Sequence, residues 1–272
     1  MRYVYAATLI LLAAVSSCAS DDVVTIVEPP APTPPVLLKD VVASSLPSPF
    51  YHFEYDARGR VSSASFASGL RMYDVTYDDD QISEVTNNVV VNHDRLQYTY
   101  DDVGRASMVK YVNASGVFTV VFFTYDGPRL TGLERDRRVD AGFIVDKTMT
   151  LTYYADGNLR ELIEHRPAVD GEQDETTTVD RFENYDTGIN VDAFALIHDE
   201  FFDHLILLPG VQLQKGNPGR VTRTGDGLNF VAEFNYNYDA MNRPTMKSGG
   251  VTVLNGADAG RTFAISSLFS YY

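Results

Sequence analysis

Carboxylate and imidazole groups in two stretches of the sequence have the spacing of metal ligands. Residues 78–80 are three consecutive aspartates, and calcium takes oxygen ligands from acidic loops of this kind. Glu200 and His204 are four residues apart, which would place both side chains on one face of a helix. A charged hairpin turn and the solvated face of an amphipathic helix account for the same residues. We therefore expect no metal site. The alternative is a metal site with ligands among Asp78, Asp80, Glu200 and His204.

A tripeptide typical of aspartic proteases occurs once, as Asp186-Thr187-Gly188. Such enzymes need two carboxylates that share a proton in a buried site, but the chain has no second copy of the motif. A turn is therefore the favoured interpretation. The sequence also lacks a Gly-x-Ser-x-Gly elbow, a phosphate-binding loop, a His-Glu-x-x-His motif and a dinucleotide fingerprint. We predict no catalytic residues and no cofactor, the alternative being a hydrolase such as a glycosidase that uses two of the many carboxylates.

The single cysteine, Cys18, lies directly behind an N-terminal apolar segment. Arg2 is followed by about 13 mostly apolar residues, too few to span a bilayer but typical of a signal peptide. The sequence Val15-Ser16-Ser17-Cys18 resembles the lipobox of bacterial lipoproteins. This resemblance implies a signal peptide over residues 1–17, a diacylglycerol on the Cys18 thiol and acylation of the new N-terminus, for example with palmitate. Several acyl chains would anchor the protein stably to a membrane. An ordinary signal peptide is the alternative.

A polar, proline-rich stretch follows the cysteine. Asp21 and Asp22 resemble the surface-export signal of Bacteroidota lipoproteins, which implies a lipid-anchored outer-membrane protein on the cell surface, or otherwise one that faces the periplasm. Seven of the 12 prolines fall within residues 29–49. Proline-rich segments are extended, semi-rigid spacers. We therefore predict a tether over residues 18–49.

Composition excludes several classes of function. The 272 residues include 22 Lys+Arg and 37 Asp+Glu, for a formal net charge of −15. Binding to a nucleic-acid backbone needs clustered basic residues, so we expect no nucleic-acid partner. One cysteine cannot build a disulfide framework or a cysteine-based zinc site. The 44% hydrophobic content argues against a chain that is disordered throughout.

The remaining residues, 50–272, repeat a Tyr-Asp step at intervals of 22 to 25 residues in its first four copies. Aromatic and β-branched residues alternate before each step, and Asp, Gly and Arg follow it, which is typical of a strand that ends in a tight turn. We predict an all-β domain, a long antiparallel meander of about 12 or more strands that forms a barrel or a strongly curved sheet. The expected strands are 50–56, 60–67, 71–78, 81–90, 95–101, 105–113, 117–126, 129–139, 145–155, 158–166, 174–184 and 229–239, with shorter ones near 219–225, 243–248 and 260–271. Apolar residues at helical spacing predict one helix near 191–206.

The Tyr-Asp hairpins resemble the YD repeats of RHS-type proteins. Their order is similar to that of the Bacteroidota lipoprotein family called domain of unknown function 4595, which is described as having a porin-like fold. The similar features are hairpins such as residues 98–105, one helix, the Lys215-Gly216-Asn217-Pro218 turn and a closing hairpin at residues 236–244. The resemblance covers roughly residues 50–272 and implies a fold, but it brings no activity and no catalytic residues.

Charge on both faces of residues 129–139 and 159–166 argues against strands that face lipid, because a membrane barrel needs an apolar outer face. We therefore predict a barrel or sheet that is apolar inside and polar outside. The leading functional prediction is a non-enzymatic envelope lipoprotein that binds an extracellular glycan or protein, or serves as a scaffold, without named binding residues. An outer-membrane structural component is a further alternative.

Overall fold

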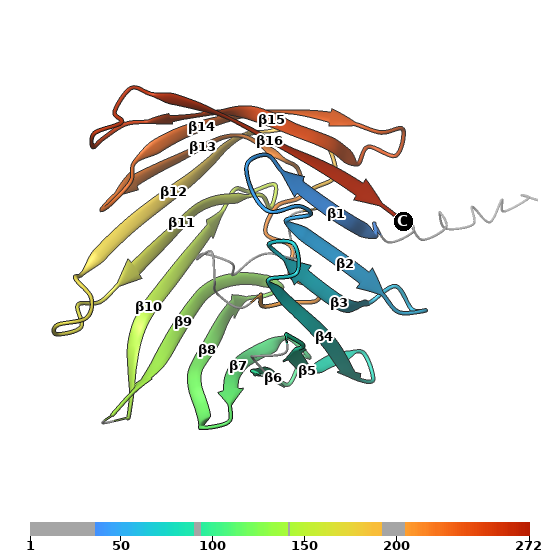
Figure 1. Cartoon of the computed structure of the whole chain (residues 1–272), viewed down its shortest axis with the longest axis vertical. Helices are drawn as coiled ribbons and strands as arrows, with labels where there is room; N and C mark the ends of the chain where they lie inside the picture. Colours follow the sequence, from blue (N-terminus) through green and yellow to red (C-terminus); the bar gives the residue numbers. More distant parts are fainter. Residues whose placement is uncertain (1–35, 90–93, 141, 192–204) are drawn as a thin grey trace, which may run out of the picture. The chain divides into compact units, whose positions relative to one another are not determined.

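The computed structural model describes residues 36–89, 94–140, 142–191 and 205–272. Sixteen β-strands lie in these residues (Figure 1). The strands are β1 (Leu38–Ala43), β2 (Tyr51–Tyr55), β3 (Val61–Phe66), β4 (Arg71–Asp78), β5 (Gln81–Asn87), β6 (Arg95–Tyr100), β7 (Ala106–Asn113), β8 (Gly116–Asp126), β9 (Arg129–Val139), β10 (Gly142–Tyr153), β11 (Leu159–Arg166), β12 (Thr176–Tyr185), β13 (Pro218–Gly225), β14 (Phe230–Tyr238), β15 (Pro244–Val253) and β16 (Thr262–Tyr271).

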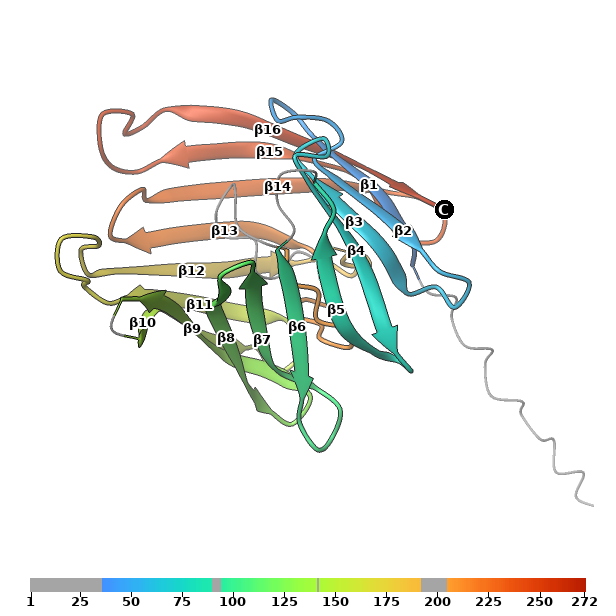
Figure 2. The same cartoon turned by 60° about the horizontal axis from the view of Figure 1, so that its bottom comes forward.

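The strands form one closed antiparallel barrel. Each strand pairs with its neighbours in sequence, and β1 pairs with β16 to close the ring. Figures 1 and 2 both show the last strand beside the first. Closure leaves no unpaired sheet edge. The all-β antiparallel meander is thus confirmed, and of the two arrangements predicted for it the structure has the barrel. No described residue belongs to a helix, so none of them forms a helix long and apolar enough to cross a bilayer.

The barrel begins earlier than the predicted boundary at residue 50. β1 lies in the predicted tether, yet Val41 pairs with Phe269 of β16 on one side and with Tyr51 of β2 on the other. Leu38 is buried, with an exposed fraction of 2%. The physical reason is the apolar content of this short strand, which the surrounding prolines masked in the sequence. If β1 were absent, β2 and β16 would be the open edges of the sheet.

The helix predicted near residues 191–206 lies almost wholly outside the described residues. At its two ends the structure is irregular rather than helical, both at Val191 and in residues 205–208. Leu205, Ile206 and Leu207 are buried in the same hydrophobic core as the strands. The described ends of this stretch therefore pack against the barrel wall and are not helical.

Side chains alternate between the inside and the outside of the barrel, as the pleat of a strand requires. On β4, Tyr73 is fully buried, whereas Met72 and Asp74 on either side of it are exposed. Buried side chains of β1–β3, β5–β11 and β16 join Tyr73 in one core cluster. The prediction of a barrel that is apolar inside and polar outside holds for this part of the wall.

A tyrosine from each even-numbered strand is bonded to the strand before it at one end of the barrel. The hydroxyl group donates a hydrogen bond of 2.6–3.2 Å to a backbone carbonyl at or next to the first residue of the preceding strand. The eight donor–acceptor pairs are Tyr55–Leu38, Tyr77–Val61, Tyr100–Ile82, Tyr125–Ala106, Tyr153–Leu130, Tyr185–Leu159, Tyr236–Pro218 and Tyr271–Pro244. We call these residues the tyrosine ring.

In three hairpins, the aspartate that follows a strand tyrosine closes the turn. Asp101 Oδ1 accepts hydrogen bonds from the backbone N–H groups of Val103 (3.1 Å) and Arg105 (2.9 Å), and Oδ2 accepts one from Arg105 Nε (2.7 Å). These bonds, first of all the one from the Arg105 backbone, lower the pKa of Asp101. Gly104 takes a φ of 83°, which glycine adopts without strain. Asp56 and Asp239 make the same contacts in their own turns.

The arginine of each such turn contacts the ring tyrosine of the next hairpin. The Arg105 guanidinium lies over the Tyr125 ring, 4.6 Å from its centroid, while the Tyr125 hydroxyl bonds the adjacent Ala106 carbonyl. Arg60 lies over Tyr77 at 4.1 Å in the same way. A cation–π contact adds about 0.5–1 kcal/mol at a site of this exposure. Each hairpin is thus held to the next by a hydrogen bond and a stacked cation.

We expect the barrel to unfold in alkali as its tyrosines ionise. Burial raises the pKa of Tyr77, Tyr100, Tyr125 and Tyr153 from 10.0 to about 12. Because the folded-state pKa lies above the unfolded value, the stability from these groups is intact below pH 10 and is lost as the pH rises toward 12. Tyrosinate absorbance and circular dichroism, followed together, should show late ionisation coupled to unfolding. Ionisation of all tyrosines near pH 10 in a folded barrel would contradict this.

Candidate functional site in the barrel lumen

A β-bulge brings an aspartate into contact with two arginines in the wall of the barrel. The pairing of β10 with β9 shifts between Val145 and Lys147, so Asp146 is the extra residue. Its carboxylate accepts hydrogen bonds from Arg135 Nε (2.9 Å) and Nη2 (3.2 Å) and lies 3.5 Å from Arg137 Nε. The Asp146 side chain is 5% exposed. Bulges commonly redirect a side chain in this way, and here the result is a buried carboxylate that fixes two guanidinium groups.

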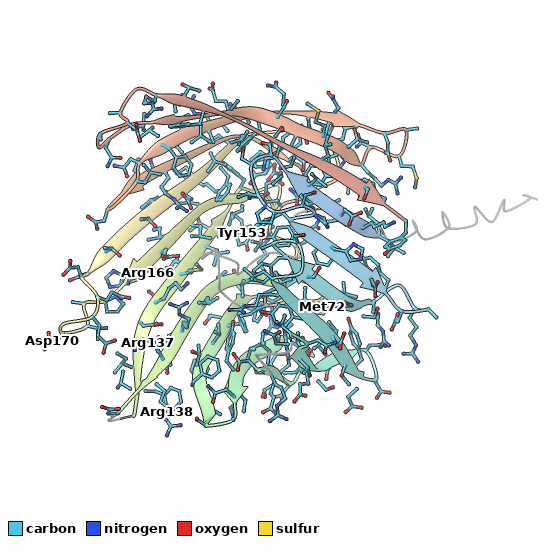
Figure 3. All side chains as sticks on the ribbon, in the orientation of Figure 1. Met72, Arg137, Arg138, Tyr153, Arg166 and Asp170 are labelled. Carbon is cyan, nitrogen blue, oxygen red and sulfur yellow. The ribbon has the colours of Figure 1, made fainter. Side chains whose placement is uncertain are left out.

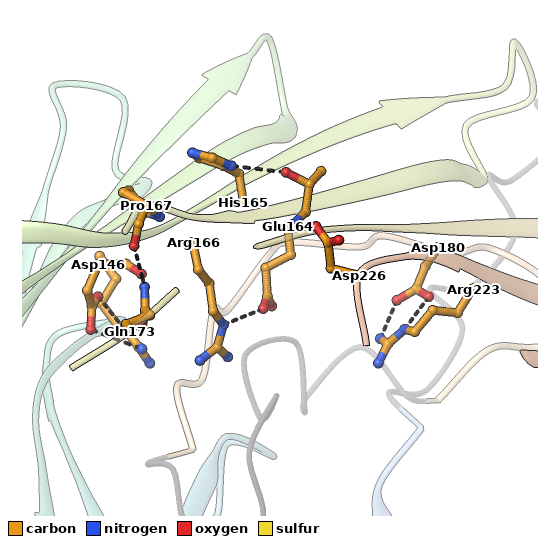
Figure 4. Close-up of polar contacts among 11 residues, drawn as sticks. Asp146, Glu164, His165, Arg166, Pro167, Gln173, Asp180, Arg223 and Asp226 are labelled. Carbon is orange, nitrogen blue, oxygen red and sulfur yellow. Dashed lines mark hydrogen bonds and ion pairs between the residues drawn. The ribbon is translucent and has the colours of Figure 1, made fainter. Parts of the chain in front are cut away.

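Two more ion pairs continue the row over β11, β12 and β13 (Figure 4). Arg166 Nε donates to Glu164 Oε1 at 2.7 Å. Arg223 donates to both oxygens of Asp180, from Nε at 2.7 Å and from Nη2 at 2.5 Å. This bidentate bond raises the pKa of Arg223 further above its usual value. We call the side chains of Arg135, Arg137, Arg166 and Arg223 the guanidinium row.

The loop between β11 and β12 contacts the same row. Gln173 Nε2 donates to the backbone carbonyl of Asp146 (3.2 Å) and to that of Pro167 (2.7 Å). Glu172 pairs with Arg137 at 2.7 Å. In Figure 3, Arg137 and Arg166 lie on the β9–β11 part of the wall. The loop therefore ties β9 and β10 to the ends of β11 and β12, and holds the row in place.

Arg137 and Arg223 are more accessible than the aspartates that bind them. Arg137 is 34% exposed against 5% for Asp146, and Arg223 is 40% exposed against 10% for Asp180. Asp146 and Asp180 therefore lie behind the guanidinium groups that they bind, whereas Glu172, which is 53% exposed, pairs with Arg137 at the surface. Guanidinium groups preorganised in this manner are suited to bind anions, because each has five N–H donors in a fixed plane.

An apolar cavity of about 420 Å³ lies beside this wall. It is lined mainly by hydrophobic side chains of β11–β15, among them Leu162, Phe182, Val221, Phe230, Ala232 and Phe234. Lys247 is the charged residue in its lining, and Lys247 Nζ lies 4.2 Å from the centroid of the Phe234 ring. Two further cavities, of about 340 and 520 Å³, adjoin β16, β1 and β2 and the tyrosine ring. Their size is that of small-molecule sites.

Asp186 lies in a turn that fixes the segment after residue 205. Its Oδ1 accepts hydrogen bonds from the backbone N–H groups of Gly188 (2.9 Å) and Asn217 (3.0 Å), and the Tyr238 hydroxyl donates to Oδ2. This is the turn favoured by the sequence, and the protease-like tripeptide has a structural role. Asn217 also donates to the Tyr238 hydroxyl at 3.0 Å, so the segment is anchored to β14 beside the apolar cavity.

Of the predicted site residues, the structure describes only Asp78 and Asp80. Cys18, Glu200 and His204 lie outside the described residues. Asp78 and Asp80 are exposed at the β4–β5 turn, where the Asp80 carboxylate pairs with Arg58 at 3.2 Å. Within the described part of the chain, no group of three or more His, Cys, Asp or Glu residues could hold a metal ion.

Sequence reasoning missed the guanidinium row. The sequence did contain a signal. Glu164 and Arg166 lie two and four residues after Leu162 on β11, and Asp180 lies two residues before Phe182 on β12, so each charged side chain lies on the same strand face as an apolar one. The charges on both faces of residues 159–166 were recognised, but the interior was still predicted to be apolar. Their inward direction becomes visible only once neighbouring strands supply partners, as Arg223 does for Asp180.

Solved structures of the same architecture exist. A porin-like protein from Bacteroides uniformis ATCC 8492 aligns with a TM-score of 0.58 over 87% of this chain and 95% of its own, at 15% sequence identity. A porin-like protein from Bacteroides vulgatus ATCC 8482 aligns with a TM-score of 0.58 over 88% of this chain and 99% of its own, at 14% identity. The chain has their porin-like fold. No protein-family model matches the sequence, and no curated protein matches it significantly.

We expect Asp146→Asn to destabilise the porin-like barrel by about 3 kcal/mol, because it leaves two arginines beside a buried neutral group. Glu134→Gln, an exposed position on β9, is the matched control and should change the free energy of unfolding by less than about 0.5 kcal/mol. Urea denaturation of both variants measures the difference. Equal stability of the two variants would show that the guanidinium row does not depend on Asp146.

Proposed function

We propose that the protein is a non-enzymatic lipoprotein of the cell envelope. Its barrel is surrounded by water and binds a ligand in its lumen. The observation that carries this proposal is the polarity of the barrel wall. Its outer face bears ion pairs, while its inner face combines apolar cavities with a guanidinium row. Alternation along each strand produces both faces from the same residues.

The outer face is unlike a lipid-facing surface. Arg181 pairs with Glu161 at 2.8 Å across β12 and β11, and Arg95 pairs with Glu84 at 3.5 Å across β6 and β5. A membrane barrel presents an apolar band there, and a charge at the bilayer midplane costs about 2–4 kcal/mol. Charged pairs on several strands therefore support a barrel surrounded by water rather than an outer-membrane structural component.

The anchor in this proposal is Cys18. The 20 residues from Cys18 to Leu37 could separate the barrel from a membrane by at most about 60 Å, at about 3.1 Å per residue for an extended chain. The acidic residues behind Cys18 support export to the cell surface. The order of the Tyr-Asp hairpins supports a relationship to the YD-repeat-like lipoproteins of domain of unknown function 4595.

The carboxyl groups of the wall support a binding role over hydrolysis. A glycosidase needs a proton-donating acid that faces a second carboxylate across the bound sugar. Burial, and secondarily Asp146, raises the pKa of Asp136, but Asp136 lines none of the three cavities. Asp146 itself is engaged by Arg135 and Arg137. The outer surface of such a module is the expected site for a glycan or protein ligand.

We expect Cys18→Ala to release the protein from membranes without altering its barrel. Fractionation of cells that express the wild type and the variant, followed by protease treatment of intact cells, measures anchoring and exposure. Wild-type protein should stay with the outer membrane and be cleaved in the tether. A variant that remains in the membrane after carbonate extraction would indicate a spanning barrel, and full protection of the wild type would indicate a periplasm-facing protein.

A further inference from the structure

We propose that the lumen binds an anionic amphiphile, a molecule with one apolar chain and one acidic head group. This inference deepens the proposed binding function by naming its ligand class. The apolar chain occupies the 420 Å³ cavity, and the head group contacts Lys247, the charged residue in its lining. Three features of the wall lead to it: the apolar lining, the cation within that lining, and the Arg223 guanidinium, which lies over the ring of the lining residue Phe230.

The lining selects an apolar body. Leu162, Phe182, Val221, Phe230 and Val251 surround the cavity, and each buried methylene of a ligand would contribute about 0.8 kcal/mol. A sugar would leave most of its hydroxyl groups without partners against such side chains, and each loss costs about 1–3 kcal/mol. The cavity therefore favours a hydrocarbon chain over a glycan.

The charges select an acidic head. Lys247 lines both the 420 Å³ cavity and the neighbouring 340 Å³ cavity, so its ammonium group borders both spaces. Arg223 lies 5.4 Å from the ring centroid of Phe230, which itself lines the larger cavity. A carboxylate, sulfate or phosphate head would make charge-assisted hydrogen bonds to Lys247, about twice as strong as neutral ones, and Arg223 adds positive charge near Phe230. A cationic head would be repelled.

The arrangement of the acids strengthens the selection. Asp180 bonds two nitrogen atoms of Arg223 from behind, with 10% of its side chain exposed, so the guanidinium is held in one orientation toward the lumen. Glu164, which lies near Arg223, accepts a hydrogen bond from Arg166 Nε. Binding then requires little ordering of these side chains, which lowers its entropic cost.

The test uses the full lipidated chain held in nanodiscs of zwitterionic phospholipid, with empty nanodiscs subtracted. Anilinonaphthalene sulfonate, itself an anionic amphiphile, reports binding by its fluorescence, and decanoate, decanol and decyltrimethylammonium are the competitors. We expect decanoate to displace the probe at least tenfold better than decanol, and decyltrimethylammonium not to displace it. An acidic oligosaccharide, oligogalacturonate, tests the glycan alternative in the same assay.

Two variants assign binding to the cavity. Lys247→Met keeps most of the side-chain volume and should weaken decanoate binding about tenfold, whereas Lys110→Met on β7 should not. Ala232→Phe fills the cavity and should abolish binding, whereas Ala264→Phe, at an exposed position on β16, should not. Circular dichroism confirms that each variant is folded, and Ala232→Leu replaces Ala232→Phe if the larger side chain prevents folding.

Several results would overturn the proposal: no saturable probe binding, equal displacement by decanol and decanoate, stronger displacement by oligogalacturonate, or unchanged binding in both cavity variants. These outcomes would leave the envelope location untouched, because anchoring is measured separately through Cys18. If the protein binds decanoate but spans the membrane, the proposed barrel in water is wrong, whereas the proposed ligand class still holds.

Discussion

A tyrosine hydroxyl that bonds the backbone carbonyl of the preceding strand is the interaction on which the barrel depends most. It recurs at one end of the barrel in every even-numbered strand, and in Tyr77 and Tyr125 a turn arginine also stacks on the ring. The turn itself is closed by the aspartate behind the tyrosine. One short sequence unit thus shapes a hairpin and joins it to its neighbour, and repetition of this unit builds a closed wall.

A closed wall of defined register separates two chemical surfaces. Because side-chain direction alternates, a one-residue slip would exchange the polar outer face with the apolar inner face. The tyrosine ring and the strand pairs prevent that slip at one end. At β9–β13 the inner face can then carry charge, since Asp146, Glu164 and Asp180 each find a guanidinium partner. The lumen is therefore amphipathic, and this property links the fold to a binding function.

Much of the fold could be predicted from local sequence, because strands and turns are local. The alternation before Tyr100 and the Asp-x-x-Gly-Arg turn behind it were sufficient for a hairpin. β1 was missed because its significance depends on β16, more than 220 residues away, where Val41 meets Phe269. Closure was left open for the same reason, since no local pattern states that the first and last strands pair.

The lumen was harder to predict than the wall. The position of Arg166 within its strand shows the face on which it lies, but only the register with β12 and β13 brings Arg223 and Asp180 to the same wall. The bulge at Asp146 adds one residue to β10 and changes which side chains face inward. Such a change has no clear signature in one sequence, because it arises from pairing with β9.

The dependence of the barrel on the tyrosine ring is tested most directly by the free energy of unfolding of four variants. These are Tyr77→Phe, Tyr125→Phe, Tyr153→Phe and the triple variant. Phenylalanine keeps the ring and its contact with arginine, so each substitution removes only the hydroxyl. We expect a loss of about 1 kcal/mol for each hydroxyl and, because the three sites lie on separate hairpins, about 3 kcal/mol for the triple variant. A triple variant as stable as the wild type would show that the barrel does not depend on the tyrosine ring.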